Sequence, residues 1–336
     1  MDSITHTVLG ACVGEIIAGK KIGKQAMFWG ALANNIPDID VVTSFWMNQA
    51  DSLLAHRGFT HSILFALLFP PILAFIFKRF YKNKNMYFRD WILLFGSGMF
   101  IHIFIDSLTC YGTGWFEPFS HKRVTMNILF VADPLYTIAF LVSFTALLII
   151  KKRKDSRKIW AKWAIYISSA YIVFASLVKL TIDSHFKEEL KNQNIAYNKY
   201  FTTPAPLTSF LWYLVAKNDS GYYMGYRSIF DKSDTIHLQY RQQNENLFTA
   251  LPSSNELLKL KRFSNDYYSA EKSGDTLYFN DIRFGTTGGW ERPNEDFVFR
   301  YFLNEGMNND LVIQRGRMKS AGKDAIKSLW ERVKGK

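Results

Sequence analysis

The chain has 336 residues, 48% of them hydrophobic and 16% aromatic, and it carries a formal net charge of +12. Most of the basic excess in residues 1–183 lies in short loops between apolar runs, so membrane topology explains the charge better than binding to nucleic acid does. The two cysteines, Cys12 and Cys110, show neither disulfide-scaffold nor zinc-finger spacing.

Six apolar stretches in residues 1–183 predict membrane segments. They lie at 4–19, 25–37, 61–77, 91–108, 134–150 and 160–182. The last four are about as long as a helix needs to be to cross a bilayer. The first two are shorter than the roughly 20 residues of a free-standing span, so a re-entrant or partly buried hairpin is the alternative for them. The first stretch also lacks the basic start and the cleavage site of a signal peptide, so we expect it to stay attached.

The loops between these segments differ sharply in charge. Fourteen Lys and Arg residues lie in three loops, at 20–24, 78–90 and 151–160, and only three lie in the other two, at 38–60 and 109–133. Lys and Arg concentrate in cytoplasmic loops. Six crossings place the three basic loops on that side, which predicts a multi-pass protein of the cell inner membrane with both termini outside the cytoplasm.

The C-terminal part has no run long enough to span a bilayer. A polar helix is expected over 184–194 and a Pro-containing link over 202–206. Further helices are expected over 254–262 and 320–333, the latter amphipathic. Period-two alternation predicts a small antiparallel sheet with strands at 222–230, 235–241, 276–284 and 296–303.

The predicted fold therefore has two parts. An α-helical polytopic membrane domain of about six membrane segments occupies residues 1–183. A small soluble α+β domain, placed outside the cytoplasm by the topology, occupies residues 184–336.

Ionisable side chains inside or beside the membrane segments form a conspicuous set. Such groups are costly at membrane depth unless they are paired, so they are functional candidates. The set comprises His6, Asp38, Asp40, His56, His61, His102 and Asp106. The topology, which was deduced from Lys and Arg alone, places all seven at or near the non-cytoplasmic ends of their segments. This agreement favours one shared site.

The spacing within this set suits metal binding. His102 and Asp106 are four residues apart, so both project from one face of a helix and can ligate one metal ion or two adjacent ones. Asp38 and Asp40 can both point inward if the turn at Pro37 is extended. Mixed His and carboxylate ligands suit Zn²⁺ best, with Mn²⁺ or Fe²⁺ as alternatives. Taken singly, each residue also has a structural interpretation, as a helix cap or as a hydrogen bonder between helices.

Small residues would let the helices approach closely enough for these ligands to converge. They are Gly10 and Gly14 in a small-xxx-small arrangement, Gly30, and Gly96 with Gly98.

Several short motifs occur between residue 1 and about residue 185. They are Thr5-His6-Thr7 with Gly10, Pro37-Asp38-Ile39-Asp40, His56-Arg57-Gly58-Phe59-Thr60-His61-Ser62, His102 to Asp106, Pro118-Phe119-Ser120 followed by Arg123, and Asp133-Pro134-Leu135-Tyr136. Together they resemble the YdjM-type (DUF457) family of inner-membrane, metal-dependent hydrolases, and the HRGxTHS element is fairly specific. The C-terminal domain lies outside this resemblance.

The family is in turn distantly similar to zinc-dependent phospholipase C and the S1/P1 nucleases. This likeness implies a phosphoester substrate and Zn²⁺. One departure concerns the N-terminus, because those soluble enzymes use their mature N-terminal amine as a ligand. Here Met1 precedes the His6 motif, so the number of metal ions does not carry over.

We therefore predict a membrane-bound, metal-dependent hydrolase that acts on a phosphoester of a lipid or lipid-linked substrate at the non-cytoplasmic surface. The predicted ligands are His6, His56, His61, His102 and Asp106, with Asp38 or Asp40 as the remaining ligand or as the catalytic base. Arg57 is expected to contact phosphate or to pair with an aspartate. The alternatives are a non-catalytic, metal-braced scaffold that recruits partners through the C-terminal domain, and, less favoured, a transporter.

Overall fold

The structure is a computed structural model that describes residues 1–81, 85–151, 155–250, 255–292, 294–303 and 323–336. The described chain divides into two compact units. The first unit comprises Met1–Val42, His56–Ser176 and Pro206–Thr208. The second comprises Thr43–Ala55, Leu177–Ala205 and Ser209–Lys336.

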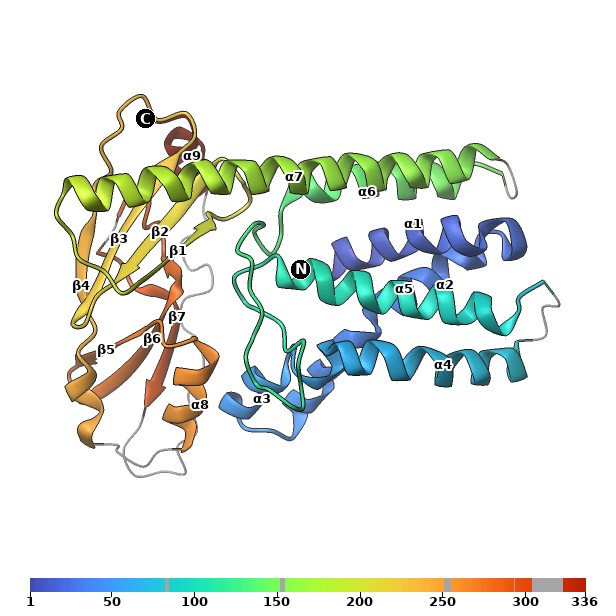
Figure 1. The fold of residues 1–336 in the computed structure, drawn as a ribbon, viewed down its shortest axis with the longest axis horizontal. Helices are drawn as coiled ribbons and strands as arrows, with labels where there is room; N and C mark the ends of the chain where they lie inside the picture. The colour runs from blue at the N-terminus through green and yellow to red at the C-terminus, as the bar shows by residue number, and fades with distance from the viewer. Residues whose placement is uncertain (82–84, 152–154, 251–254, 293, 304–322) are drawn as a thin grey trace. The chain divides into compact units, whose positions relative to one another are not determined.

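The first unit is helical, as predicted, and its helices lie side by side (Figure 1). Its elements are α1 (Ser3–Ile22), α2 (Gln25–Asn35), the first part of the 3₁₀ segment η1 (Ile36–Phe45), the 3₁₀ turn η2 (Phe59–His61), α4 (Ile63–Phe80), α5 (Phe88–Ser107), α6 (Pro134–Ile149) and the first half of α7 (Asp155–Asn192).

Three of these helices are long and apolar enough to cross a membrane, namely α4, α5 and α7. The apolar α6 is shorter. The side chains of α4 and α7 are mostly exposed although they are apolar, which suits helices that face lipid. Helix α7 also runs on through the expected polar helix at 184–194, so the two predicted segments are one continuous helix. The full set of six crossings remains a prediction.

Helices α1 and α2 form a tight hairpin. A Cβ atom placed on Gly14 would lie 2.0 Å from the Ala26 carbonyl oxygen, and one on Gly30 would lie 2.2 Å from the Gly10 carbonyl oxygen. Any side chain larger than hydrogen at these positions would force the helices apart. The predicted small-residue contact is therefore confirmed for Gly10, Gly14 and Gly30. Gly98 of α5 makes a similar close approach to Ala33 of α2, whereas Gly96 does not.

The basic loops meet at one end of this unit. Lys20 at the end of α1 pairs with Asp155 at the start of α7 at 2.7 Å, and Lys21 pairs with Asp90 at the start of α5 at 2.5 Å. Asp106 lies sixteen residues further along α5, so an α-helical rise of 1.5 Å per residue separates it from Asp90 by about 24 Å. The positive end of the helical unit is therefore opposite the end that carries the candidate ligands.

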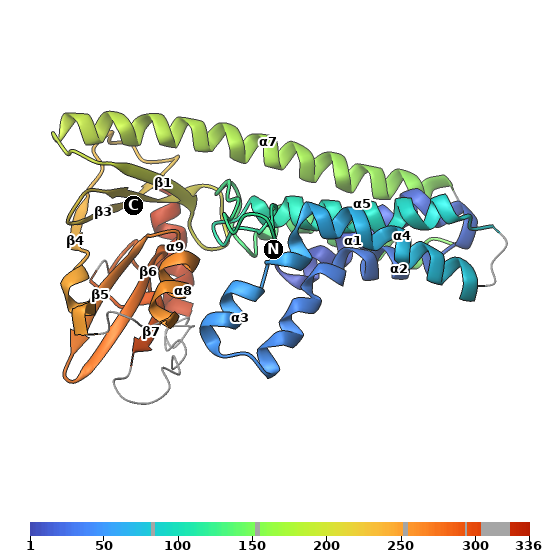
Figure 2. The same cartoon turned by 60° about the horizontal axis from the view of Figure 1, so that its bottom comes forward.

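The second unit is built in layers (Figure 2). Its antiparallel sheets have the strand orders β1-β2-β3-β4 and β5-β6-β7. The strands are β1 (Lys199–Pro204), β2 (Leu211–Lys217), β3 (Gly221–Ser228), β4 (Gln239–Gln242), β5 (Tyr268–Ser273), β6 (Thr276–Thr286) and β7 (Phe297–Leu303). The other elements are α3 (Gln49–Ala55), the 3₁₀ segment η3 (Glu245–Ala250), α8 (Asn255–Phe263) and α9 (Lys323–Val333).

Strand β2 explains why these layers stack. Its residues 212, 214 and 216 pack with Ile182 and Phe186 of α7, while residues 213 and 215 pack with Ile282 and Phe297 of the second sheet. Both faces of β2 are thus buried, and the strand reads as a continuous apolar run without alternation.

The sequence therefore predicted part of this unit. The strands at 222–230, 276–284 and 296–303 and the helix at 254–262 are confirmed with small shifts in their ends. The expected single sheet was wrong, because there are two sheets. The segment 202–206 is partly strand β1, and of the predicted strand at 235–241 only residues 239–241 are strand, in β4. The predicted helix at 320–333 is present from Lys323, and its first residues lie outside the described chain.

Candidate metal centre

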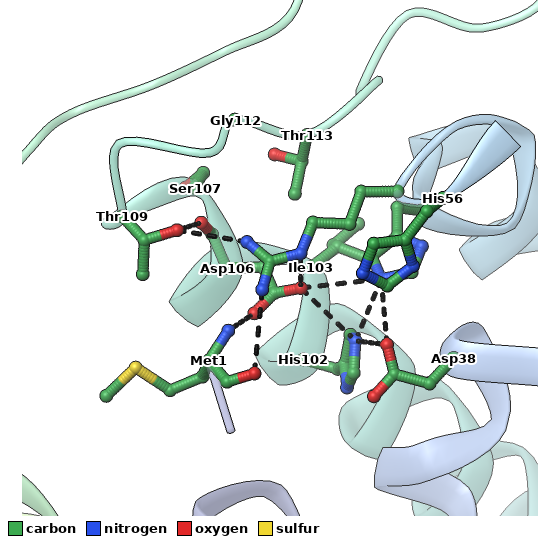
Figure 3. Close-up of polar contacts among 12 residues, drawn as sticks. Met1, Asp38, His56, His102, Ile103, Asp106, Ser107, Thr109, Gly112 and Thr113 are labelled. Carbon is green, nitrogen blue, oxygen red and sulfur yellow. Dashed lines mark hydrogen bonds and ion pairs between the residues drawn. The ribbon is translucent and has the colours of Figure 1, made fainter. Parts of the chain in front are cut away.

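Four buried or half-buried side chains from three elements converge at one end of the first unit (Figure 3). Asp38 comes from η1, His61 from η2, and His102 and Asp106 from successive turns of α5. The three residues other than Asp38 are fully buried, and the Asp38 side chain is 23% exposed. We call Asp38, His61, His102 and Asp106 the inner ligand group.

The distances between the ligand atoms of this group suit coordination of one ion with tetrahedral geometry. His61 Nε2 lies 3.5 Å from Asp38 Oδ1, 3.4 Å from Asp106 Oδ2 and 3.0 Å from His102 Nε2. His102 Nε2 lies 3.5 Å from each of the same two carboxylate oxygens. Ligands bound to Zn²⁺ at about 2.0–2.1 Å in a tetrahedron are about 3.3–3.4 Å apart. Five of the six separations are therefore close to those of ligands around one tetrahedral divalent ion, and the sixth, between the two carboxylate oxygens, is at most 4.8 Å.

The two imidazole rings are held in the orientation that metal ligation requires. His102 Nδ1 lies 2.5 Å from the carbonyl oxygen of Asn34, and because that oxygen only accepts, Nδ1 carries the hydrogen. His61 Nδ1 lies 3.2 Å from Asp40 Oδ2 and is oriented in the same way. Nε2 of each ring consequently faces the other ring, at 3.0 Å. Metal-bound histidines show this arrangement, with Nδ1 donating to a carbonyl or carboxylate.

An orphaned polar atom provides an independent test of fit. Oδ2 of Asp106 is buried and accepts no hydrogen bond from the described residues. It lies 3.0 Å from Nε of Arg57, which likewise has no hydrogen-bond partner among those residues, so the two are an ion pair without hydrogen-bond geometry. The guanidinium therefore lies against this oxygen as a charge but gives it no hydrogen bond, which leaves a buried carboxylate oxygen without a donor. The donor set therefore fits a divalent ion.

A second set of possible ligands shares Asp38. Asp38, Asp40 and His56 each offer an atom within 4.8 Å of the others, and we call them the outer ligand group because the His56 side chain is 30% exposed. Burial raises the pKa of Asp38, but the nearby imidazoles of His102 and His61 outweigh this effect and hold the pKa well below its ordinary value. Solvent can reach the centre from this side.

Asp40 has a different set of contacts from Asp38. Its Oδ2 accepts hydrogen bonds from the backbone N–H of Arg57 at 2.8 Å and from the hydroxyl of Thr60 at 2.9 Å, besides facing His61. Its Oδ1 lies 3.0 Å from Nδ1 of His56. Burial raises the pKa of Asp40, but hydrogen bonds from His56 and His61 have the larger effect and hold the pKa below its ordinary value. The carboxylate is therefore ionised. Asp40 thus holds the whole 56–61 segment in place.

His6 lies beside the inner ligand group. Its ring stacks on His102 with centroids 3.8 Å apart, and its Nε2 is 3.1 Å from Asp106 Oδ1. The amino group of Met1 forms a buried ion pair with the same oxygen. Burial and the charge of Arg57 lower the pKa of this amino group to about 6, against the opposite effect of Asp106.

The two arginines named by the motifs are buried. Arg57, whose backbone φ is +59°, directs its guanidinium to Asp106 and donates to the Thr109 hydroxyl at 3.0 Å. Of its two predicted roles, the salt bridge to an aspartate is therefore present. Arg123 donates to the carbonyl oxygen of His56 at 2.8 Å, and both guanidiniums lie against the ring of Tyr111.

The sequence did not single out every residue that builds this site. The Asn34 side chain donates to the carbonyl oxygen of His6 at 2.6 Å, and its backbone orients His102. An amide inside an otherwise apolar segment was the available signal. The roles of Thr60 and Thr109 carried no such signal, because hydroxyl residues are common in loops.

Comparison with known proteins places these features in a family. The model of the YdjM inner membrane protein family matches residues 1–182. The chain belongs to the YdjM family. All seven predicted ligands lie within the matched region, and the family together with the apolar helices indicates insertion in the inner membrane.

Two relatives show how far the similarity extends. Inner membrane protein YbcI of Escherichia coli (strain K12) is 33% identical over 122 residues, which cover 36% of this chain and 69% of that protein. The uncharacterized protein YfhP of Bacillus subtilis (strain 168) is 32% identical over 151 residues, or 43% of this chain and 45% of its own length. No solved structure matches the chain. The likeness to zinc-dependent phospholipases and nucleases stays a prediction.

Proposed function

We propose that this YdjM-family protein is a membrane-bound, metal-dependent hydrolase. One observation carries the proposal: the Nε2 atoms of two buried imidazoles lie 3.0 Å apart, beside the carboxylates of Asp38 and Asp106. Two such nitrogens are stable this close only with a cation between them, a shared proton or a metal ion, and the carboxylates of Asp38 and Asp106 offer anionic ligands that favour the metal ion. We favour Zn²⁺ because the donors are mixed nitrogen and oxygen atoms.

The chain's own residues divide the work between binding and positioning. The inner ligand group would hold one ion, and Asp38, Asp40 and His56 would be the ligands of a second. A bound divalent ion supplies Lewis-acid activation of water and of a phosphoryl oxygen. Asp40 orients His61 through Nδ1 and fixes the backbone of Arg57, which makes it a positioning residue. Arg57 pairs with Oδ2 of Asp106 and balances part of the negative charge of that carboxylate.

The substrate we propose is a phosphoester of a lipid or lipid-linked molecule on the non-cytoplasmic side. The paired basic loops lie at one end of the helical unit, and both ligand groups lie at the opposite end. This arrangement supports an orientation with both termini and the second unit outside the cytoplasm. A transporter is disfavoured because the candidate ligands lie at one end of the bundle and the buried charges at the other end, Glu15 and Arg157, form a closed ion pair.

Metal analysis and a substrate screen test the proposal together. Protein purified in detergent should contain a divalent ion and lose it in the variant His61→Ala, and the metal-loaded protein in bilayers should cleave a phospholipid or a lipid-carrier phosphate. Folded wild-type protein that stays metal-free after zinc supplementation would show that the cluster is a hydrogen-bonded network. Metal-loaded protein without turnover, whose ligand variants keep their cellular role, would favour the scaffold alternative.

A further inference from the structure

Most of the residues between Asp40 and His56 belong to a different unit from the residues that flank them. Thr43–Ala55 clusters with the second unit, whereas Met1–Val42 and His56–Ser176 belong to the first. The segment includes α3 (Gln49–Ala55). The chain therefore leaves the first unit shortly after Asp40 and returns to it at His56, and both residues belong to the outer ligand group.

The segment is anchored in the second unit by apolar contacts. Ala50 of α3 is 1% exposed and lies in a core cluster with Phe248 and with Leu257 and Leu260 of α8. Leu53 packs against the same cluster. Insertion of a charged side chain at Ala50 would place it among apolar side chains, so the docking is sensitive to a single substitution.

A polar contact also contributes to the docking. Asp51 of α3 pairs with Lys259 of α8 at 2.6 Å. The pair is partly exposed, so its contribution is about 0–1 kcal/mol, but reversal of either charge would replace attraction by repulsion. The two charges can therefore be exchanged between positions 51 and 259 so that the ion pair is kept.

The covalent connections between this segment and the ligands are very short. Only Val41 and Val42 separate Asp40 from Thr43, and His56 follows Ala55 directly. Asp40 in turn holds Arg57, Thr60 and His56 by the hydrogen bonds described above. A shift of the segment would thus act on both ends of the outer ligand group without touching the inner residues of α5.

We propose that the second unit controls the outer ligand group by holding the segment Thr43–Ala55. This inference rests on the proposed metal-dependent function and adds a mode of regulation to it. When α3 is docked on α8, Asp40 and His56 are held in register for binding. When α3 is released, the Asp40 hydrogen bonds to residues 56–61 loosen while His102 and Asp106 stay in place.

The test uses the full-length protein in detergent with two readouts, Zn²⁺ affinity and hydrogen exchange. The variants are Ala50→Arg, Asp51→Lys, Lys259→Asp and the charge exchange that combines the last two. We expect Zn²⁺ binding to weaken about tenfold in each single variant, the usual size of a second-shell effect. Backbone amides at 57–62 should exchange faster in these variants, and amides of α5 should not change. The combined charge exchange should restore both readouts.

Two control variants separate docking from general destabilisation. Ala50→Ser keeps a small side chain and should behave as wild type. Arg292→Glu breaks an exposed ion pair with Glu295 in the second unit, 3.5 Å long, without touching the segment, and should leave both readouts unchanged. If Ala50→Arg releases residues 43–55 to exchange while Zn²⁺ affinity and amides 57–62 stay at wild-type values, the inference is overturned.

Failure of the two proposals can be told apart. Wild-type protein that binds no Zn²⁺ would contradict the proposed function, and the exchange data would still decide whether the second unit holds residues 56–61. Wild-type protein that binds Zn²⁺ with the same affinity as Asp51→Lys and Lys259→Asp would contradict only the control by the second unit.

Discussion

The helical unit contains two buried clusters of charge that are built in opposite ways. At the basic end, Glu15 of α1 pairs with Arg157 of α7, which is 1% exposed, through two hydrogen bonds of 2.8 and 2.6 Å. The remaining guanidinium donors reach the carbonyl oxygens of Leu147 and Ile150 and the sulfur of Met27. This cluster is fully satisfied within the protein.

The cluster at the opposite end is not satisfied by protein groups. Among the described residues, Oδ2 of Asp106, Nδ1 of His6 and Nε of Arg57 are buried and lack a hydrogen-bond partner. A closed ion pair needs nothing more to be stable, whereas open polar atoms in a buried place point to a missing ligand. The difference separates a structural ion pair from a binding site within one bundle.

The largest expected effect belongs to the structural pair. Arg157→Ala leaves Glu15 buried and unpaired, so the free energy of unfolding should fall by about 3–5 kcal/mol. Unfolding in detergent, followed by tryptophan fluorescence, measures this change. Lys20→Ala is the control, because its pair with Asp155 is 70% and 80% exposed and should matter little. Equal effects of the two variants would remove the distinction drawn here, and Zn²⁺ binding should not change in either.

Bound metal should raise the stability of the protein through the cluster around Asp106 and not through the Glu15–Arg157 pair. At a free Zn²⁺ concentration of 100 times Kd, wild-type protein should gain about 2.7 kcal/mol of stability. Asp106→Asn keeps the shape but removes the charge and one ligand, so the gain should disappear. Thermal unfolding with and without Zn²⁺ measures it. An equal gain in Asp106→Asn would mean that zinc binds elsewhere.

Replacement of Asp38 and replacement of Asp40 should change Zn²⁺ affinity to different extents. Asp40→Asn perturbs the orientation of His61 without removing an inner ligand, so Zn²⁺ affinity should fall about 10–100-fold while the ion is still bound. Asp38→Asn should abolish binding to the inner group. The control is Glu117→Gln, which alters a similar carboxylate-histidine contact, 2.9 Å long, with exposed His121. Identical behaviour of the two aspartate variants would contradict the positioning role of Asp40.

The smallest effect is expected when both partners of the closed pair are replaced. Glu15→Leu combined with Arg157→Met removes both charges together, so stability should stay within about 1 kcal/mol of wild type. The comparison with Arg157→Ala alone gives the cost of the stranded charge. A double variant as unstable as the single one would show that the packing of these side chains, and not their charge balance, holds this end of the bundle.

The sequence determined the elements whose signals are local. Apolar runs, basic loops and the glycines at 10, 14 and 30 predicted a helical membrane unit with close helix contacts, since hydropathy and side-chain size act over a few residues. The HRGxTHS element and the spacing of His102 and Asp106 likewise named the residues that converge at the site. Period-two alternation found three strands, each with at least one partly exposed side chain.

Only the tertiary structure decided what depends on distant neighbours. Strand β2 is buried on both faces, so it has no alternation, and the two sheets could not be distinguished until their partners were known. The division of work between Asp38 and Asp40 arises from His61, Thr60 and the backbone of Arg57, which their shared Asp-Ile-Asp sequence does not encode. The docking of Ala50 onto α8 joins residues about two hundred positions apart. Such contacts follow from which surfaces can be buried together, and no local pattern specifies them.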